Sequence, residues 1–243
     1  MSTPAALIVF CALALASLLT VSLVNRKQQR TQVMRQKLKK LKRRIEDLED
    51  LVVMLDQLVE SRAIAKLIND EVIELLRGML TLADSATYLE AKLSDAESMS
   101  QKLSHESPHR ELCRLQDSDA QIARSEYALN EAGRILQSQY ARSYITVEER
   151  DTFISELAWA RLQVKVISHI GQGHRIIRTG DIIEAHAFYR KAQHLLIQSK
   201  HPDPRRQRMI KEVSELLNLR RHFLSQDLMP ETQYNPDASS ATL

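Results

Sequence analysis

Two histidines and a cysteine stand at four-residue intervals near the middle of this chain: His105, His109 and Cys113. On a continuous helix this spacing would place the three side chains on one face, where imidazole and thiolate groups could hold a soft metal ion. Pro108 lies between them and disfavours a continuous helix. We therefore interpret the segment as a polar loop followed by an ordinary cysteine, and we predict no metal site.

The remaining histidines show no better pattern. His169 and His174 are five residues apart and fall on different faces of a helix, and His186 and His194 lie in a segment whose stronger signals are for packing. The sequence has no glycine-rich phosphate loop, no nucleophile elbow and no paired metal motif. We predict no catalytic residues and no cofactor, and we expect that the protein is not an enzyme.

The first element along the chain is an apolar segment, and residues 1–25 are predicted to form a transmembrane anchor. Pro4 to Val24 contains no charged residue, and as a helix this stretch would reach roughly 30 Å, the thickness of a bilayer's hydrocarbon core. The alternative is a cleaved signal peptide, since Ala14-Leu15-Ala16 resembles a cleavage site. The residues before Pro4 carry no positive charge, which disfavours that alternative.

A basic segment follows directly, with no acidic residue between positions 26 and 44. It predicts that the N-terminus lies outside and the rest of the chain in the cytoplasm. The compact layout with a single anchor favours a bacterial inner membrane. The expected partner of residues 26–44 is an anionic membrane surface. Nucleic acid is the disfavoured alternative, because no aromatic residues alternate with the basic ones. These basic residues are Arg26, Lys27, Arg30, Arg35, Lys37, Lys39, Lys40, Lys42, Arg43 and Arg44.

Residues 26–61 combine this basic segment with a heptad pattern that predicts a coiled-coil stalk. Branched residues at one core position and leucines at the other favour a parallel two-stranded coiled coil, and hence a homodimer. The alternative is that the same helix is the first member of an intramolecular bundle. The predicted core residues are Leu38, Leu41, Ile45, Leu48, Val52, Leu55 and Val59.

The body of the chain, residues 62–226, is predicted to be a helical domain, and the fold class is all-α. Glycines and prolines are few, and apolar residues recur at helical spacing. Helices are expected from Arg62, over 87–103, over 111–141, and from Thr146, where Thr146 and Glu149 form a capping box. Pro202 introduces a last helix, and residues 227–243 are expected to be a disordered tail.

One part of this domain resembles a tetratricopeptide repeat, a pair of antiparallel helices. The resemblance covers about residues 166–200 and depends on small and aromatic residues at the spacing of that repeat: Gly173, Ile176, Gly180, Ala185, Tyr189 and Ala192. It implies a helical bundle or solenoid with a concave groove for a protein partner. The groove would include Ile170, His174, Ile177 and Arg178, although ordinary packing against a neighbouring helix explains the same four residues.

Together these features favour a membrane-anchored protein–protein interaction module or scaffold with an unidentified protein partner. The alternative is a purely structural membrane protein that associates with itself through the coiled coil. A nucleic-acid tether through the basic segment is the third hypothesis.

Overall fold

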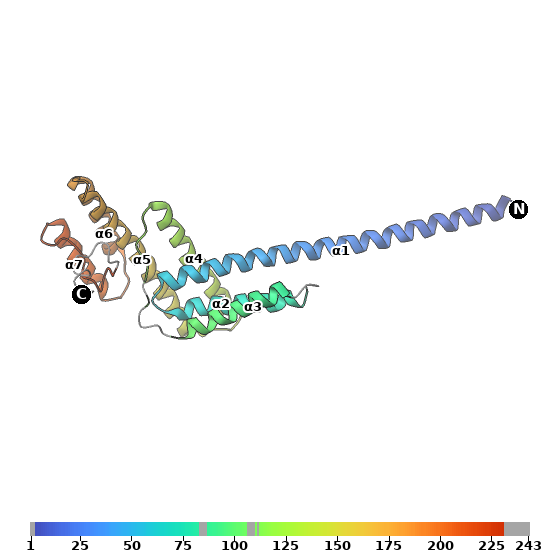
Figure 1. Cartoon of the computed structure of the whole chain (residues 1–243), viewed down its shortest axis with the longest axis horizontal. Coiled ribbons are helices and arrows are strands. Elements are labelled where there is room, and N and C mark those ends of the chain that lie inside the picture. The colour runs from blue at the N-terminus through green and yellow to red at the C-terminus, as the bar shows by residue number, and fades with distance from the viewer. Residues whose placement is uncertain (1–2, 83–86, 106–109, 111, 231–243) are drawn as a thin grey trace.

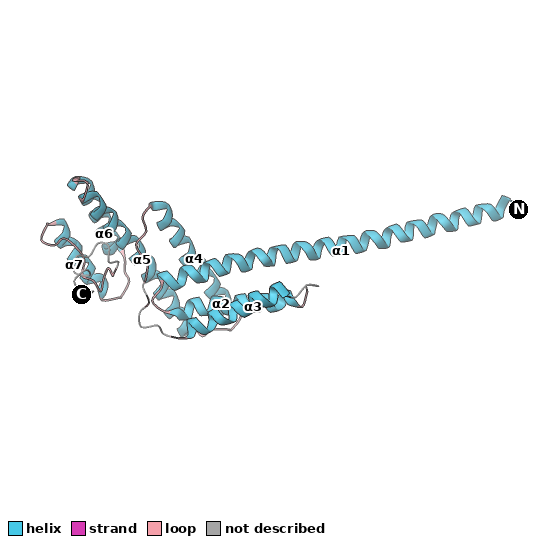
Figure 2. Ribbon diagram, in the orientation of Figure 1, coloured by secondary structure: helices cyan, strands magenta, loops and turns pink. Residues whose placement is uncertain are grey.

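The computed structural model describes residues 3–82, 87–105, 110 and 112–230, and for residues 3–24, 26, 27 and 30 it describes the backbone alone. Within this part the chain forms seven α-helices and no strand (Figures 1 and 2), which confirms the all-α class. In chain order the helices are α1 (Thr3–Leu58), α2 (Arg62–Leu80), α3 (Thr87–Ser104), α4 (Asp119–Ala141), α5 (Val147–Ile177), α6 (Ile182–Gln198) and α7 (Arg205–Leu217).

The first helix is a single continuous element of 56 residues. Its N-terminal part projects away from the other helices, and its C-terminal part lies beside α2 and α4 (Figure 1). The side chains of the predicted span, Pro4 to Val24, lie outside the described ones. In the part of the chain that the structure describes, no helix combines the length and the apolar character needed to cross a membrane.

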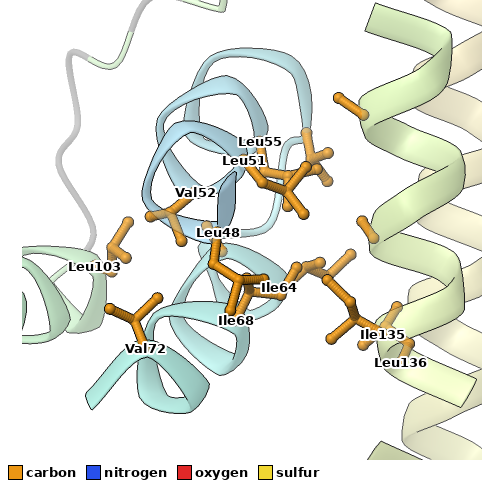
Figure 3. Packing of buried hydrophobic residues seen from close by; sticks show 14 of the residues in the cluster. Leu48, Leu51, Val52, Leu55, Ile64, Ile68, Val72, Leu103, Ile135 and Leu136 are labelled. Carbon is orange, nitrogen blue, oxygen red and sulfur yellow. The ribbon is translucent and has the colours of Figure 1, made fainter. Parts of the chain in front are cut away.

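The predicted coiled-coil core is buried within one chain. Leu48, Val52 and Leu55 of α1 point toward α2, α3 and α4 (Figure 3) and are almost inaccessible to solvent. The two-stranded seam predicted over residues 45–59 is thus replaced by an intramolecular bundle, because α2 and α4 already cover those side chains. Leu38 and Leu41 are only partly buried at the edge of the same cluster.

Charged residues of α1 also find their partners within the chain. Arg44 lies 3.2 Å from a carboxylate oxygen of Glu131 in α4 and 4.0 Å from one of Glu71 in α2. Glu49, which a parallel dimer would pair with Arg44 of a second chain, accepts instead from Lys92 of α3 at 2.6 Å. These charged residues of α1 therefore pair with α2, α3 and α4 of the same chain.

The longest helix outside the stalk, α5, connects two hydrophobic clusters. Leu157, Ala160 and Val164 join the cluster formed by α1 to α4. Trp159, Leu162 and the residues from Val166 onward join the cluster formed with α6, α7 and the chain that follows them. Leu228 and Met229 are buried in this second cluster, so the ordered domain extends past Asp227, where the disordered tail was predicted to start. Residues 231–243 lie outside the described part.

The predicted start of the fourth helix at Glu111 is wrong. The described residues from 112 to 116 are not helical, and α4 begins at Asp119 with Ser118 as its N-cap. Tertiary partners take the hydrogen bonds that a helix would need: the Cys113 N–H donates to the Gln57 carbonyl, and the Gln116 N–H donates to the Ser168 hydroxyl. This segment therefore ties α1 to α5.

The predicted capping box at the start of α5 is confirmed. The Thr146 hydroxyl accepts from the Glu149 N–H at 3.2 Å, and the Glu149 carboxylate accepts from the Thr146 N–H at 2.8 Å, which completes the capping box. The chain reverses between α5 and α6 at Gly180, which has a φ of +90° that side chains disfavour. The helix pair predicted over 166–200 thus corresponds to the end of α5 and to α6, and its identity as a tetratricopeptide repeat stays a prediction.

Gly173 lies at a close approach of α5 and α6, and we expect its replacement by alanine to destabilise the fold. A Cβ there would lie 2.5 Å from Cε1 of Tyr189, whose ring is buried and whose hydroxyl is bonded to His174. The ring has no room to move, so overpacking should lower the free energy of unfolding by about 1–3 kcal/mol in urea titrations.

Gly78 provides the matched control, because it is an exposed position within α2 with no atom near its added Cβ. Gly78→Ala should stabilise the chain by about 0.5–1 kcal/mol through helix propensity alone. Equal stabilisation by both substitutions would contradict the close approach of α5 and α6.

Candidate functional site

The four residues of the predicted groove separate into two pairs. Ile170 and His174 are buried in the second cluster, whereas Ile177 and Arg178 are exposed at the end of α5. The structure therefore does not bring all four to one accessible surface. The packing alternative is correct for the first pair.

His174 is the most strongly perturbed of the described histidines. Its Nδ1 lies 2.7 Å from the Tyr189 hydroxyl, and its ring packs against Phe223. Burial and then the positive charge of Arg178 lower its pKa to about 4, while burial raises the pKa of Tyr189. At neutral pH the Tyr189 hydroxyl therefore donates to a neutral imidazole. The pair stabilises the contact between α5 and α6.

In the described part of the segment from His105 to Cys113, backbone groups form hydrogen bonds with other parts of the chain. The carbonyl of His105 accepts from Arg62, and Cys113 is exposed, while His109 lies outside the described residues. Within the described ranges, no group of three His, Cys, Asp or Glu side chains is placed to hold a metal ion.

The most developed polar site is a pocket at the middle of α5, where the two hydrophobic clusters meet. It has a volume of about 150 Å³ and is lined from three directions. One wall is α5 itself, the second is Glu60 in the α1–α2 turn, and the third is the α6–α7 loop. The lining residues are Glu60, Ser155, Glu156, Trp159, Ala160, Gln163, His201, Asp203 and Arg205.

A network of ion pairs closes one side of this pocket. Arg205 donates to both Glu60 oxygens, at 2.6 and 3.1 Å, and to Asp203 at 2.7 Å. The buried Arg114 donates to Glu60 at 2.9 Å. Burial would raise the pKa of Glu60, but the hydrogen bond from Arg205 and the charge of Arg114 outweigh it and lower that pKa. Glu60 is therefore a fixed negative charge shared by two arginines.

Trp159 lines the pocket and contacts two residues from the segment between α6 and α7 and the start of α7. The His201 ring stacks on it with centroids 5.2 Å apart, and the Arg205 guanidinium lies 5.1 Å from its ring centroid. These contacts orient the indole without using its N–H group.

The serine and histidine in this pocket do not form a nucleophile–base pair. His201 Nδ1 accepts from the Asp203 N–H at 3.2 Å, and His201 Nε2 lies 3.0 Å from the Ser155 carbonyl, which can only accept. The ring proton is therefore on Nε2, the nitrogen that also faces the Ser155 hydroxyl at 3.2 Å. Because this nitrogen already carries its proton, it cannot take one from Ser155, and the arrangement indicates binding.

Three buried polar atoms of residues that line the pocket have no hydrogen-bond partner among the described residues: Glu156 Oε2, Trp159 Nε1 and Gln163 Oε1. Trp159 is 4% exposed and Gln163 is 3% exposed. Burial and the negative charge of Glu60 raise the pKa of Glu156, although a hydrogen bond from Ser61 acts in the opposite direction. The pocket thus combines buried, unmatched polar groups with an excess of carboxylates.

The sequence contained part of this pattern, which our sequence reasoning missed. Glu156, Trp159 and Gln163 follow the i, i+3, i+7 spacing of one helix face. A face of polar residues on a helix that is otherwise largely buried could have indicated a polar site there. Glu60, His201, Asp203 and Arg205 lie outside α5, and no sequence spacing linked them to this face.

Comparison with known proteins gives no matching family model, no curated relative and no solved structure of similar fold. The described part of the chain defines an all-α protein with a small polar pocket.

Proposed function

We propose that this chain is a membrane-anchored protein–protein interaction module whose helical domain binds another protein through the turn between α5 and α6. The observation that carries the proposal is a group of exposed isoleucines at this turn: Ile177, Ile182 and Ile183, the last of which is 87% exposed. Single exposed apolar residues are ordinary, but three within seven positions around one turn favour a contact surface.

The surroundings of this isoleucine turn suit a protein interface. Arg178, Asp181 and Glu184 are exposed around it and would supply the polar rim that such interfaces have. Ile177 and Arg178 belong to the groove predicted from the sequence, so the proposed surface keeps the accessible half of that prediction. The partner would therefore contact the outside of the helix pair.

The position of the turn in the molecule fits presentation at a membrane. α6 lies at the end of the molecule opposite the N-terminus (Figure 1). If Pro4 to Val24 crosses the bilayer, the helix from Asn25 to Leu38 would hold the bundle about 20 Å away from it. Exposed Arg35, Lys37, Lys39 and Lys40 would contact anionic head groups, each contributing about 1 kcal/mol near the surface.

A photoreactive amino acid at position 183, introduced into the full chain in intact cells, tests this proposal. We expect a covalent adduct with a defined protein in the membrane fraction, because the side chain at 183 would lie in the interface. Ile182→Asp should abolish the adduct without changing the thermal midpoint, since both residues are exposed.

Two controls accompany this measurement. The same photoreactive group at Tyr127, an exposed position on α4, should give no adduct with that protein, and a chain without residues 4–24 should leave the membrane fraction. Capture of the same proteins from positions 183 and 127, or an adduct that survives Ile182→Asp, would refute the proposed surface.

Self-association through the stalk is the second candidate, and one observation favours it. Val33 and Met34 are exposed on the projecting part of α1, next to the partly buried Leu38 and Leu41. This leaves about one heptad for a second chain, whereas stable coiled coils use three to four. A homodimer would therefore depend on the membrane segment more than on the stalk.

A further inference from the structure

The pocket at the middle of α5 contains groups that a folded protein ordinarily satisfies. A buried donor or acceptor without a partner costs about 1–3 kcal/mol, and such atoms are few in native proteins. Here three such atoms, Trp159 Nε1, Gln163 Oε1 and Glu156 Oε2, belong to residues that line one small pocket. Whatever occupies it should supply at least two donors, for Gln163 and Glu156, and one acceptor, for Trp159.

The charges in the pocket restrict the occupant further. Three carboxylates line it, from Glu60, Glu156 and Asp203. Two guanidiniums lie beside them: Arg205 in the lining, and Arg114, which also donates to Glu60. Arg205 pairs with Glu60 and Asp203, whereas Glu156 belongs to none of the ion pairs that the described residues form. A cation is therefore favoured beside Glu156, and a ligand carboxylate is disfavoured by the remaining negative charge.

The size of the pocket sets the size of the ligand. A cavity of about 150 Å³ holds a molecule of about six non-hydrogen atoms. A protonated primary amine has three N–H donors, which is enough for the two acceptors, and a neighbouring hydroxyl can accept from the indole N–H.

From these three restrictions we propose that the α5 pocket binds a small amino alcohol, with its ammonium group at Glu156 and Gln163 and its hydroxyl at Trp159. The binding site joins the α1–α2 turn, α5 and the α6–α7 loop, so an occupied pocket ties the two hydrophobic clusters together. None of the pocket residues belongs to the isoleucine turn, so ligand binding and partner binding are separate properties of the chain.

Trp159 makes the test direct, because it is the only tryptophan in the chain and its fluorescence reports the pocket alone. We expect ethanolamine, added to the full chain in detergent micelles and phosphate buffer, to change this fluorescence saturably, with a dissociation constant on the order of 1 mM. Ethylene glycol lacks the cation, propylamine lacks the acceptor and glycine adds a carboxylate, so each should bind at least about tenfold more weakly.

A pair of variants with the same chemical change locates the site. Glu156→Gln removes the charge at the pocket and should weaken ethanolamine binding about tenfold or more. Glu74→Gln makes the same change at an exposed position of α2 and should leave the affinity unchanged. If Glu156→Gln fails to fold, the comparison of the four ligands on the unaltered chain decides the question.

Saturable binding of ethanolamine in preference to the other three ligands supports the proposal, and so does its loss in Glu156→Gln. No response to any amine would mean that water alone satisfies these atoms, and equal responses to ethanolamine and ethylene glycol would remove the role of charge. Either result overturns the assignment.

Discussion

Replacing Leu55 with alanine is expected to lower the free energy of unfolding by about 2–5 kcal/mol. Leu55 is 0% exposed in the cluster that α1 forms with α2, α3 and α4 (Figure 3), and the tight surroundings leave a cavity when its side chain is shortened. A loss of this size is a large fraction of the stability of a typical domain. Urea unfolding followed by helical circular dichroism measures it.

Val53 is the matched control, because it lies two residues away on the same helix and is 48% exposed. Val53→Ala should change the stability by no more than about 0.5 kcal/mol. If a second chain covered the heptad positions instead, the unfolding midpoint would rise with protein concentration. A midpoint that depends on concentration, or equal costs at positions 53 and 55, would contradict the intramolecular bundle.

Acidification is expected to destabilise the chain through His174 by about 3 kcal/mol. The pKa of this buried ring is lowered to about 4 in the folded state, whereas an unfolded histidine titrates near its ordinary value of about 6.5. Between these two values the unfolded chain binds the additional proton, so stability rises with pH in that interval. The contribution is complete above about pH 6.5 and is lost as the pH falls to about 4.

His174→Gln provides the measurement, because glutamine can keep a hydrogen bond to Tyr189 but does not titrate in this range. The difference in unfolding free energy between the unaltered chain and this variant should change by about 3 kcal/mol between pH 7 and pH 4. Glu156 and His169 titrate in both chains, so their effects cancel in the difference. His194→Gln removes an exposed ring from α6 and should leave the pH dependence as it is; the same pH profile for both variants would exclude His174 as the cause.

The local features of this fold could be predicted because their partners lie within a few residues. The capping box at Thr146 and Glu149 and the turn at Gly180 use contacts between neighbours in the chain. The third helix, expected over 87–103, is observed as Thr87–Ser104. Helical periodicity was likewise sufficient for the all-α class.

Predictions failed where a distant segment supplied the partner. The heptads of α1 are compatible with a second chain or with α2 and α4, since an apolar stripe does not specify what covers it. Cys113 and Gln116 were expected in a helix, but their N–H groups donate to Gln57 and Ser168 instead. His174 was predicted to line a groove, but it is buried against Tyr189 and Phe223. These two residues come from α6 and from the chain after α7, so their contact with His174 could not be read from local spacing.

The amino-acid sequence by itself determined the helical class, the ends of several helices, the apolar N-terminal stretch and the spacing of Glu156, Trp159 and Gln163 on one face of α5. Only the tertiary structure decided that α1 packs within its own chain and that Glu60, His201, Asp203 and Arg205 complete a pocket around that face. The physical reason is that hydrogen bonding and periodicity along a helix depend on near neighbours. Burial and charge pairing depend on which distant segments meet.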